Sequence, residues 1–65
     1  MERTITVHGM SCEGCEASVV EALESVSGVE SATADREQEQ ASVSGDVRVE
    51  ELVVAVEDAG YEASA

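Results

Sequence analysis

Large apolar side chains are so scarce in this chain that they limit how many cores it can build. Fourteen of the 65 residues are Val, Ile or Leu, and there is no Phe or Trp. This share is barely above the roughly 20% below which a highly charged chain tends to stay disordered. We therefore expect one small domain over residues 1–65. Because so short a chain has no room for a large catalytic cleft, we do not expect an enzyme.

The charge of the chain is strongly acidic, with a formal net charge of −12 at pH 7, no Lys and 3 Arg. Phosphate binding needs clustered cations, and Arg3, Arg36 and Arg48 are scattered, so we expect neither nucleic acid nor an anionic membrane as a partner. Repulsion among the acidic groups falls in concentrated salt, where the Debye length is about 3 Å at 1 M. The composition is typical of a salt-accumulating halophile, with an ordinary acidic surface as the alternative.

The chain has no sequence signal for a membrane or for export. No apolar run reaches the roughly 18 residues of a membrane span, and no basic amino-terminal segment leads into an apolar one. We therefore expect a cytoplasmic protein, and one that starts at Met1 and stops soon after Ala63 is expected to be free-standing. Cytoplasmic thiols are kept reduced, so Cys12 and Cys15 are expected to be ligands or redox groups rather than a structural disulfide.

In the first half of the chain, apolar residues alternate and then repeat at helical spacing. Residues 3–8 alternate with β-branched side chains, which predicts a strand with Ile5 and Val7 on one face. From residue 13 to residue 26 the spacing fits an amphipathic helix, and Gly28 suits a left-handed cap. The expected buried stripe of this helix is Val19, Val20, Leu23 and Val26, and its expected solvated side is Glu16, Glu21 and Glu24.

The second half of the chain repeats this order with shorter elements. We expect an alanine-rich strand, a polar turn, a third strand, a second helix and a closing strand at residues 29–34, 35–38, 41–43, 49–59 and 61–63. The order β-α-β-β-α-β is that of the ferredoxin-like α+β sandwich, in which two helices lie on one face of a four-stranded antiparallel sheet. The expected stripe of the second helix is Val49, Leu52, Val53, Val56 and Ala59. Both helical stripes would be buried against that face, and this agreement is why we expect the chain to fold.

One segment between the first strand and the first helix carries a chemical signature. Residues 9–15 read Gly-Met-Ser-Cys-Glu-Gly-Cys, so both sulfurs can point to the same side of the loop-to-helix junction. Cu(I) is a soft ion that prefers thiolates, and two of them suffice for a near-linear site. Zn(II) prefers four ligands, whereas this chain offers two thiols and one imidazole. The segment therefore predicts one Cu(I) per monomer, bound by Cys12 and Cys15.

The protonation state of these thiols depends on opposing effects. The amino terminus of the helix favours a thiolate, whereas Glu13 and Glu16 oppose it. The direction of any shift in thiol pKa is therefore open at this stage.

A wider pattern joins the cysteine segment to the rest of the chain. Residues 9–15, the Gly-Val pair at 28–29 and the Asp-Ala-Gly-Tyr run at 58–61 together resemble the heavy-metal-associated domain. That family includes small copper chaperones and the amino-terminal metal-binding modules of copper-transporting P-type ATPases. The resemblance spans essentially the whole chain and implies that Cys12 and Cys15 are the metal ligands.

Four neighbours of the cysteines can also be interpreted. The resemblance implies that Met10 is buried and that Tyr61 lies beside the site. Zinc-exporting relatives often carry Asp immediately before the first cysteine. This chain has Ser11 there, which favours copper. From the residues themselves we expect Met10 to pack in the core and His8 to be an exposed polar residue, not a third ligand. Ser11 is expected to cap the helix, and Tyr61 to fill core with its hydroxyl toward water and to shield the site as a second role.

The function that these features favour is that of a cytosolic Cu(I) metallochaperone. A sparsely coordinated ion leaves room for a thiolate from another protein, so copper could pass by ligand exchange to the metal-binding domain of a copper-transporting P-type ATPase. The protein would be a monomer or a metal-bridged dimer. The alternatives are a thiol–disulfide redox protein, a domain for Zn or Hg, and a copper store. The chain is much shorter than a thioredoxin fold, and no Pro or Trp flanks its cysteines.

Overall fold

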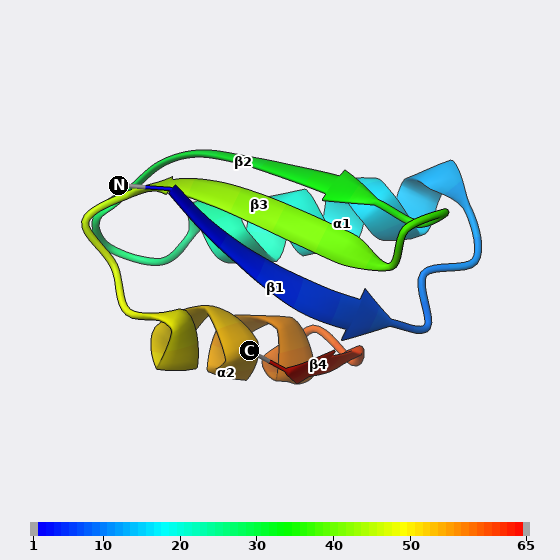
Figure 1. Ribbon diagram of the computed structural model, residues 1–65. Helices are drawn as coiled ribbons and strands as arrows, with labels where there is room; N and C mark the ends of the chain where they lie inside the picture. The colour runs from blue at the N-terminus through cyan, green and yellow to red at the C-terminus, as the bar shows by residue number, and fades with distance from the viewer. Residues whose placement is uncertain (1, 65) are drawn as a thin grey trace.

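The computed structural model describes residues 2–64 and has the predicted βαββαβ order (Figure 1). One antiparallel sheet, in the order β2-β3-β1-β4, is formed by β1 (Glu2–His8), β2 (Val29–Asp35), β3 (Gln40–Gly45) and β4 (Glu62–Ser64). One face of this sheet is covered by α1 (Glu13–Glu24) and α2 (Val49–Asp58). The predicted ferredoxin-like sandwich is confirmed. Met1 and Ala65, the ends of the predicted domain, lie outside the described residues.

The central part of the sheet is apolar on one face and polar on the other. The buried side chains of β1 and β3 pack against the helices, and they are Ile5, Val7, Ala41 and Val43. The alternate positions pair Thr4 with Ser42 and Thr6 with Gln40 on the open face. Since strand side chains alternate between faces, the scarce apolar area of these two strands all goes to the helix side.

Each helix buries two side chains completely. Val19 and Leu23 of α1 and Leu52 and Val56 of α2 have exposed fractions of 0%, which confirms the centres of both predicted stripes. The flanking members Val20, Val26, Val49 and Val53 are only partly buried. The prediction that Ala59 belongs to the second stripe is wrong, because α2 ends at Asp58 and Ala59, the residue after it, is exposed. None of the described helices, within residues 2–64, is long and apolar enough to cross a membrane.

The limits of several elements differ from the predictions by one or two residues. Helix α1 ends at Glu24, and the N–H of Ser25 still donates to the Glu21 carbonyl at 3.1 Å. Beyond it, the N–H of Val26 donates to the Leu23 carbonyl at 3.1 Å, and the hydroxyl of Ser25 donates to the Ala22 carbonyl at 2.6 Å. These contacts tighten the last turn into an i to i−3 pattern. The strands extend further than predicted where they pair, since β2 and β3 are paired out to Asp35 and Gln40.

Candidate metal site

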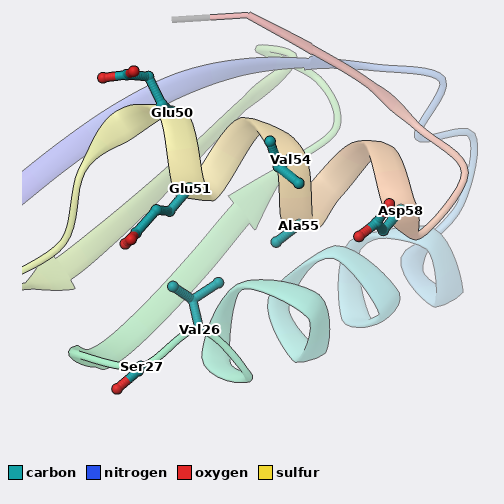
Figure 2. A pocket seen from close by; sticks show the side chains of 7 residues that line it. All are labelled: Val26, Ser27, Glu50, Glu51, Val54, Ala55 and Asp58. Carbon is teal, nitrogen blue, oxygen red and sulfur yellow. The ribbon is translucent and has the colours of Figure 1, made fainter.

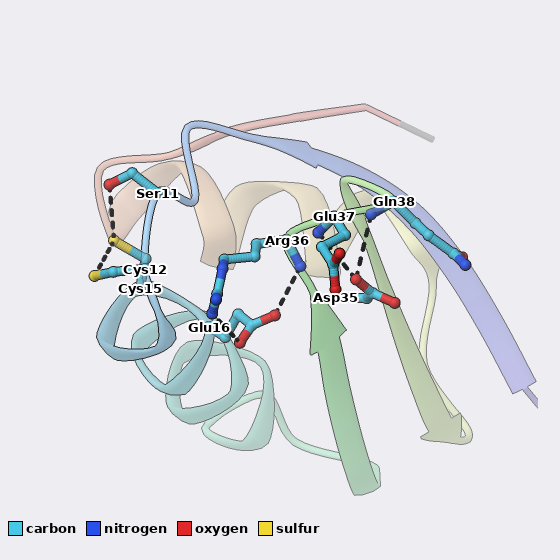
Figure 3. A network of polar contacts seen from close by, with 8 residues as sticks. All are labelled: Ser11, Cys12, Cys15, Glu16, Asp35, Arg36, Glu37 and Gln38. Atoms are coloured by element: carbon cyan, nitrogen blue, oxygen red, sulfur yellow. Dashed lines mark hydrogen bonds and ion pairs between the residues drawn. The ribbon is translucent and has the colours of Figure 1, made fainter.

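Cys12 and Cys15 lie where the loop after β1 becomes helix α1. Cys12 is the last residue before the helix, with an extended backbone, and its carbonyl accepts hydrogen bonds from the N–H groups of Cys15 at 3.0 Å and Glu16 at 3.2 Å. This first turn brings the two sulfurs to 3.5 Å from each other, as free thiols (Figure 3). Cys12 is exposed and Cys15 is partly buried. The structure therefore brings together the two predicted ligands.

Ser11 does not cap the helix, so that prediction is wrong. The capping position belongs to Cys12, and the start of α1 has no side-chain cap hydrogen bond. The hydroxyl of Ser11 instead lies 3.8 Å from the sulfur of Cys15 (Figure 3). Because the helix begins one residue later than a serine cap would require, the Ser11 hydroxyl faces the sulfur pair.

The pKa of the Cys15 thiol is lowered from 9.0 to about 6, mainly by a hydrogen bond from the Ser11 backbone N–H. The Tyr61 hydroxyl, the Cys12 thiol and the Ser11 hydroxyl add further hydrogen bonds to the sulfur, and desolvation opposes them. Hydrogen bonds to the charged form stabilise it, so these donors favour the thiolate of Cys15. The sequence left open whether the thiol pKa values are raised or lowered. The pKa of Cys15 is lowered, and the hydrogen-bond donors responsible come from the loop and from Tyr61.

Tyr61 packs beside the sulfur pair, as expected from the sequence. It is partly buried against the core, and its ring lies so near the loop that a Cβ atom added to Gly9 would be 3.7 Å from its Cδ1. The pKa of its hydroxyl is raised, chiefly by the hydrogen bond to Cys15. Met10 is 9% exposed and belongs to the core, which confirms its predicted packing role. The hydrogen bond from Tyr61 to Cys15 was not expected, because the sequence brings the two residues together only through the fold.

Two polar neighbours of the loop are engaged elsewhere. His8 is exposed, as predicted, and its Nδ1 lies 2.9 Å from a carboxylate oxygen of Glu39. Glu16 was predicted to be a solvated residue, and that prediction is wrong: its partly buried carboxylate binds both the backbone and the guanidinium of Arg36. Within residues 2–64, no cluster of three or more His, Cys, Asp or Glu residues could hold a metal ion.

A groove of about 450 Å³ lies away from the cysteines, between the end of α1 and α2 (Figure 2). Its lining includes Val26 and Val54, of which Val54 is 55% exposed, together with the carboxylates of Glu50, Glu51 and Asp58. The cysteines do not line it. The groove is therefore separate from the sulfur pair, which is reached from solvent through the exposed Cys12.

A thiolate and a thiol side by side can hold a soft metal ion after a small movement. Two metal–sulfur bonds of about 2.3 Å, the length in zinc thiolates, span about 4.6 Å when they are collinear. The sulfurs are 3.5 Å apart, so a two-coordinate ion requires them to separate by about 1 Å. Cys12 is the exposed partner, and its sulfur lies over Gly14, where an added Cβ would still be 3.7 Å away. An outward rotation of Cys12 supplies the movement without displacing the core.

Known proteins with similar sequences and structures match this chain over nearly its full length. The heavy-metal-associated domain family matches residues 4–62. The copper chaperone CopZ of Staphylococcus haemolyticus (strain JCSC1435) is 40% identical over 65 residues, which cover 95% of this chain and 96% of that protein. A solved CopZ metallochaperone has a TM-score of 0.92 at 37% identity and covers 98% of this chain and 100% of its own. A copper-binding domain from HMA7, a P-type ATPase, has a TM-score of 0.92 at 38% identity, with coverage of 97% and 89%.

Proposed function

The chain belongs to the heavy-metal-associated domain family, and from this premise we propose that it is a Cu(I) metallochaperone with Cys12 and Cys15 as the metal ligands. The observation that carries the proposal is the pair of free sulfurs 3.5 Å apart, with Cys12 exposed. The lowered pKa of Cys15 supports it. Each monomer would bind one Cu(I). The protein would act as a single carrier domain of the cytoplasm rather than as an enzyme.

The donor set favours Cu(I) over Zn(II). Zinc in proteins takes four ligands or three with water, whereas Cu(I) is satisfied by soft thiolates. The one histidine of the chain is paired with Glu39, and Met10 is buried in the core. Neither residue is oriented as a further ligand, so the two sulfurs are left to bind the ion by themselves.

The exposure of the sulfurs supports transfer by ligand exchange. Cys12 is exposed, so a thiolate of a second protein can reach an ion that Cys12 and Cys15 share. We propose that the recipient is the metal-binding domain of a copper-transporting P-type ATPase. This choice is supported by the likeness to the copper-binding domain of HMA7, because donor and recipient of the same fold could each present a sulfur pair. The carrier itself would be a monomer or a metal-bridged dimer.

The experiment that tests the proposal compares two acceptors of matched Cu(I) affinity. The Cu(I)-loaded protein is mixed with a substoichiometric chelator or with the apo form of a Cys-x-x-Cys domain from such an ATPase, and the loss of copper is followed in time. We expect fast transfer to the domain and slow removal by the chelator. Equal rates would contradict a chaperone role. Mass measurement of the loaded protein gives the ion count and the oligomeric state.

A redox function is the second candidate, because the lowered pKa of Cys15 is also what a thiol–disulfide oxidoreductase requires. Titration of the reduced protein with Cu(I), Zn(II) and Hg(II) against calibrated competitors tests the cargo, and a disulfide-reduction assay tests the redox activity. Of the two physiological ions, we expect Cu(I) to bind more tightly than Zn(II), and we expect no catalysis of disulfide reduction. Measurable disulfide reduction with negligible Cu(I) affinity would replace the chaperone proposal by the redox one.

A further inference from the structure

We propose that the turn between β2 and β3, residues 36–39, fastens the two ends of the metal loop to each other, and that Glu16 and Arg36 are positioning residues for the cysteines. We call residues 36–39 the brace. Its effect on copper rests on the proposed function, but the fastening itself does not. The brace contacts neither sulfur, so it acts through the backbone on each side of the cysteine segment.

The first contact fastens the brace to the start of α1. The carboxylate of Glu16 accepts hydrogen bonds from the backbone N–H of Arg36 at 2.7 Å and from its Nη1 at 3.2 Å (Figure 3). The side chains of Glu16 and Arg36 are only 24% and 36% exposed. An exposed ion pair contributes little, but a carboxylate that accepts a short hydrogen bond from a backbone N–H is held in one place. Glu16 directly follows Cys15, so this contact fixes the first turn of the helix.

The second contact fastens the brace to the end of β1. The carbonyl of Glu39 accepts a hydrogen bond from the N–H of Val7 at 2.8 Å, and its carboxylate lies 2.9 Å from Nδ1 of His8. Glu39 adopts a φ of 55°, a left-handed conformation that is uncommon for a residue with a side chain. The two contacts with β1 therefore stabilise Glu39 in this conformation.

Hydrogen bonds within the turn also order the brace between these two contacts. The Oδ1 atom of Asp35, at the end of β2, accepts hydrogen bonds from the N–H groups of Glu37 at 2.9 Å and Gln38 at 3.2 Å (Figure 3). Such a side-chain hydrogen bond to the following backbone stabilises a tight turn. The brace is thus closed at its start by Asp35 and held at its end by β1.

Together the contacts place the cysteine segment between two fixed points. Upstream, Val7 and His8 are bound to Glu39, and downstream, Glu16 is bound to Arg36. A binding loop that is already ordered loses less conformational entropy when it binds, which raises affinity without any added contact to the ligand. The backbone of Cys12 and Cys15 is then preset, and only the Cys12 side chain has to turn when the sulfurs separate.

The experiment compares Glu16→Ala with Glu21→Ala in the full chain. Glu21 is an exposed carboxylate on the same helix, and its side chain has no hydrogen bond or ion pair among the described residues, so the control removes the same charge without touching the brace. In the apo proteins, amide hydrogen exchange is measured at Cys15, whose N–H is bonded to the Cys12 carbonyl, and at the core residue Leu23. We expect Glu16→Ala to speed exchange at Cys15 about tenfold more than at Leu23, and Glu21→Ala to change neither.

The same variants are then titrated with Cu(I) against a calibrated competitor. We expect Glu16→Ala to bind Cu(I) about tenfold more weakly than Glu21→Ala, and X-ray absorption to show a wider spread of Cu–S distances. Glu16→Gln keeps an oxygen that can accept from the Arg36 N–H, so it should restore most of the affinity. If Glu16→Ala does not fold, Arg36→Ala takes its place, because it removes the Nη1 contact of the same pair, with a smaller loss expected since the backbone N–H is kept.

The outcomes separate the brace from the proposed function. Equal exchange at Cys15 in the Glu16 and Glu21 variants would overturn the fastening, even if the protein carries copper. Faster exchange with unchanged Cu(I) affinity would overturn the positioning role and leave the contact merely structural. If the unmodified chain fails to bind Cu(I), the proposed function fails, and the exchange data on the apo protein still decide whether the brace exists.

Discussion

Replacing either cysteine should affect Cu(I) affinity much more than folding. Each is one of only two soft donors, so Cys12→Ser and Cys15→Ser should each lower Cu(I) affinity by orders of magnitude. Cys12 is exposed and contributes no core, so its replacement should change the free energy of unfolding by less than about 0.5 kcal/mol. Cu(I) competition and circular dichroism of the apo variants measure both effects. An unfolded Cys12→Ser variant would show that the pair is structural.

The lowered pKa of Cys15 predicts its reactivity with pH. The thiolate is the nucleophile, so alkylation of Cys15 should rise through a midpoint near pH 6 instead of 9, followed by mass spectrometry that resolves the two cysteines. Tyr61→Phe removes a donor to the sulfur, so it should move the midpoint of alkylation upward. A midpoint near 9 in the unmodified protein would contradict the hydrogen-bonded thiolate.

The same shift links stability to pH. Because the pKa of Cys15 is lower in the folded state, the thiolate stabilises the fold fully above about pH 9, and this contribution is lost as the pH falls to about 6.

For single residues, the sequence predicted the positions that local spacing determines. The cysteine pair, the buried Met10 and the exposed His8 follow from local spacing or from the family pattern. Glu16 could not be predicted in the same way, because its partner Arg36 is 20 residues away and is brought to it by the sheet. Ser11 was misplaced by one residue, since a serine before a helix can either cap it or face a neighbouring group.

Among the turns that join the elements, two glycines with the same backbone conformation differ in their surroundings. Gly28 and Gly60 both have a φ of 98°, but a Cβ at Gly28 would lie 2.6 Å from the Asp46 carbonyl oxygen, whereas one at Gly60 would meet nothing within 4 Å. Gly28→Ala should therefore destabilise the fold by about 3 kcal/mol and Gly60→Ala by about 1 kcal/mol. Denaturant unfolding measures the two values. Equal losses would mean that the Asp46 backbone yields to the added methyl.

The elements themselves were largely predictable, because their limits and faces follow from the spacing of a few apolar residues. Leu23 and Leu52 mark the centres of the helical stripes in the sequence as they do in the fold. The limits of strand β2 do not follow from its sequence, since the inward side chains of Ala32 and Ala34 are small and its pairing with β3 decides where it ends. The end of α1 was predicted two residues too late, because the N–H of Val26 bonds to the Leu23 carbonyl and the apolar spacing does not show this change of hydrogen bonding.

Across the whole molecule, acidic charges greatly outnumber the cations that could offset them. The net charge is −12 with His8 neutral, and among the described residues one Arg–carboxylate ion pair forms, Arg36 with Glu16, while His8 is hydrogen-bonded to Glu39. The longest dimension of the fold is 28 Å. The Debye length is about 30 Å at 0.01 M salt and about 3 Å at 1 M. In dilute buffer every acidic group therefore repels every other across the molecule, and in concentrated salt only near neighbours interact.

This repulsion predicts that the fold requires salt. Within residues 2–64 the core has 10 buried apolar side chains, several of them Val or Ala, so the apolar burial that opposes repulsion is small. Raising KCl from 0.01 to 1 M should raise the free energy of unfolding of the apo protein by on the order of 2 kcal/mol, a large part of the total for a domain of this size. Circular dichroism during denaturant unfolding measures it. Sucrose at matched osmolality is the control, because it favours compact states without screening charge. A fold equally stable at both KCl concentrations, or stabilised as much by sucrose as by KCl, would refute a halophilic adaptation. Neither result would bear on the proposed metal site.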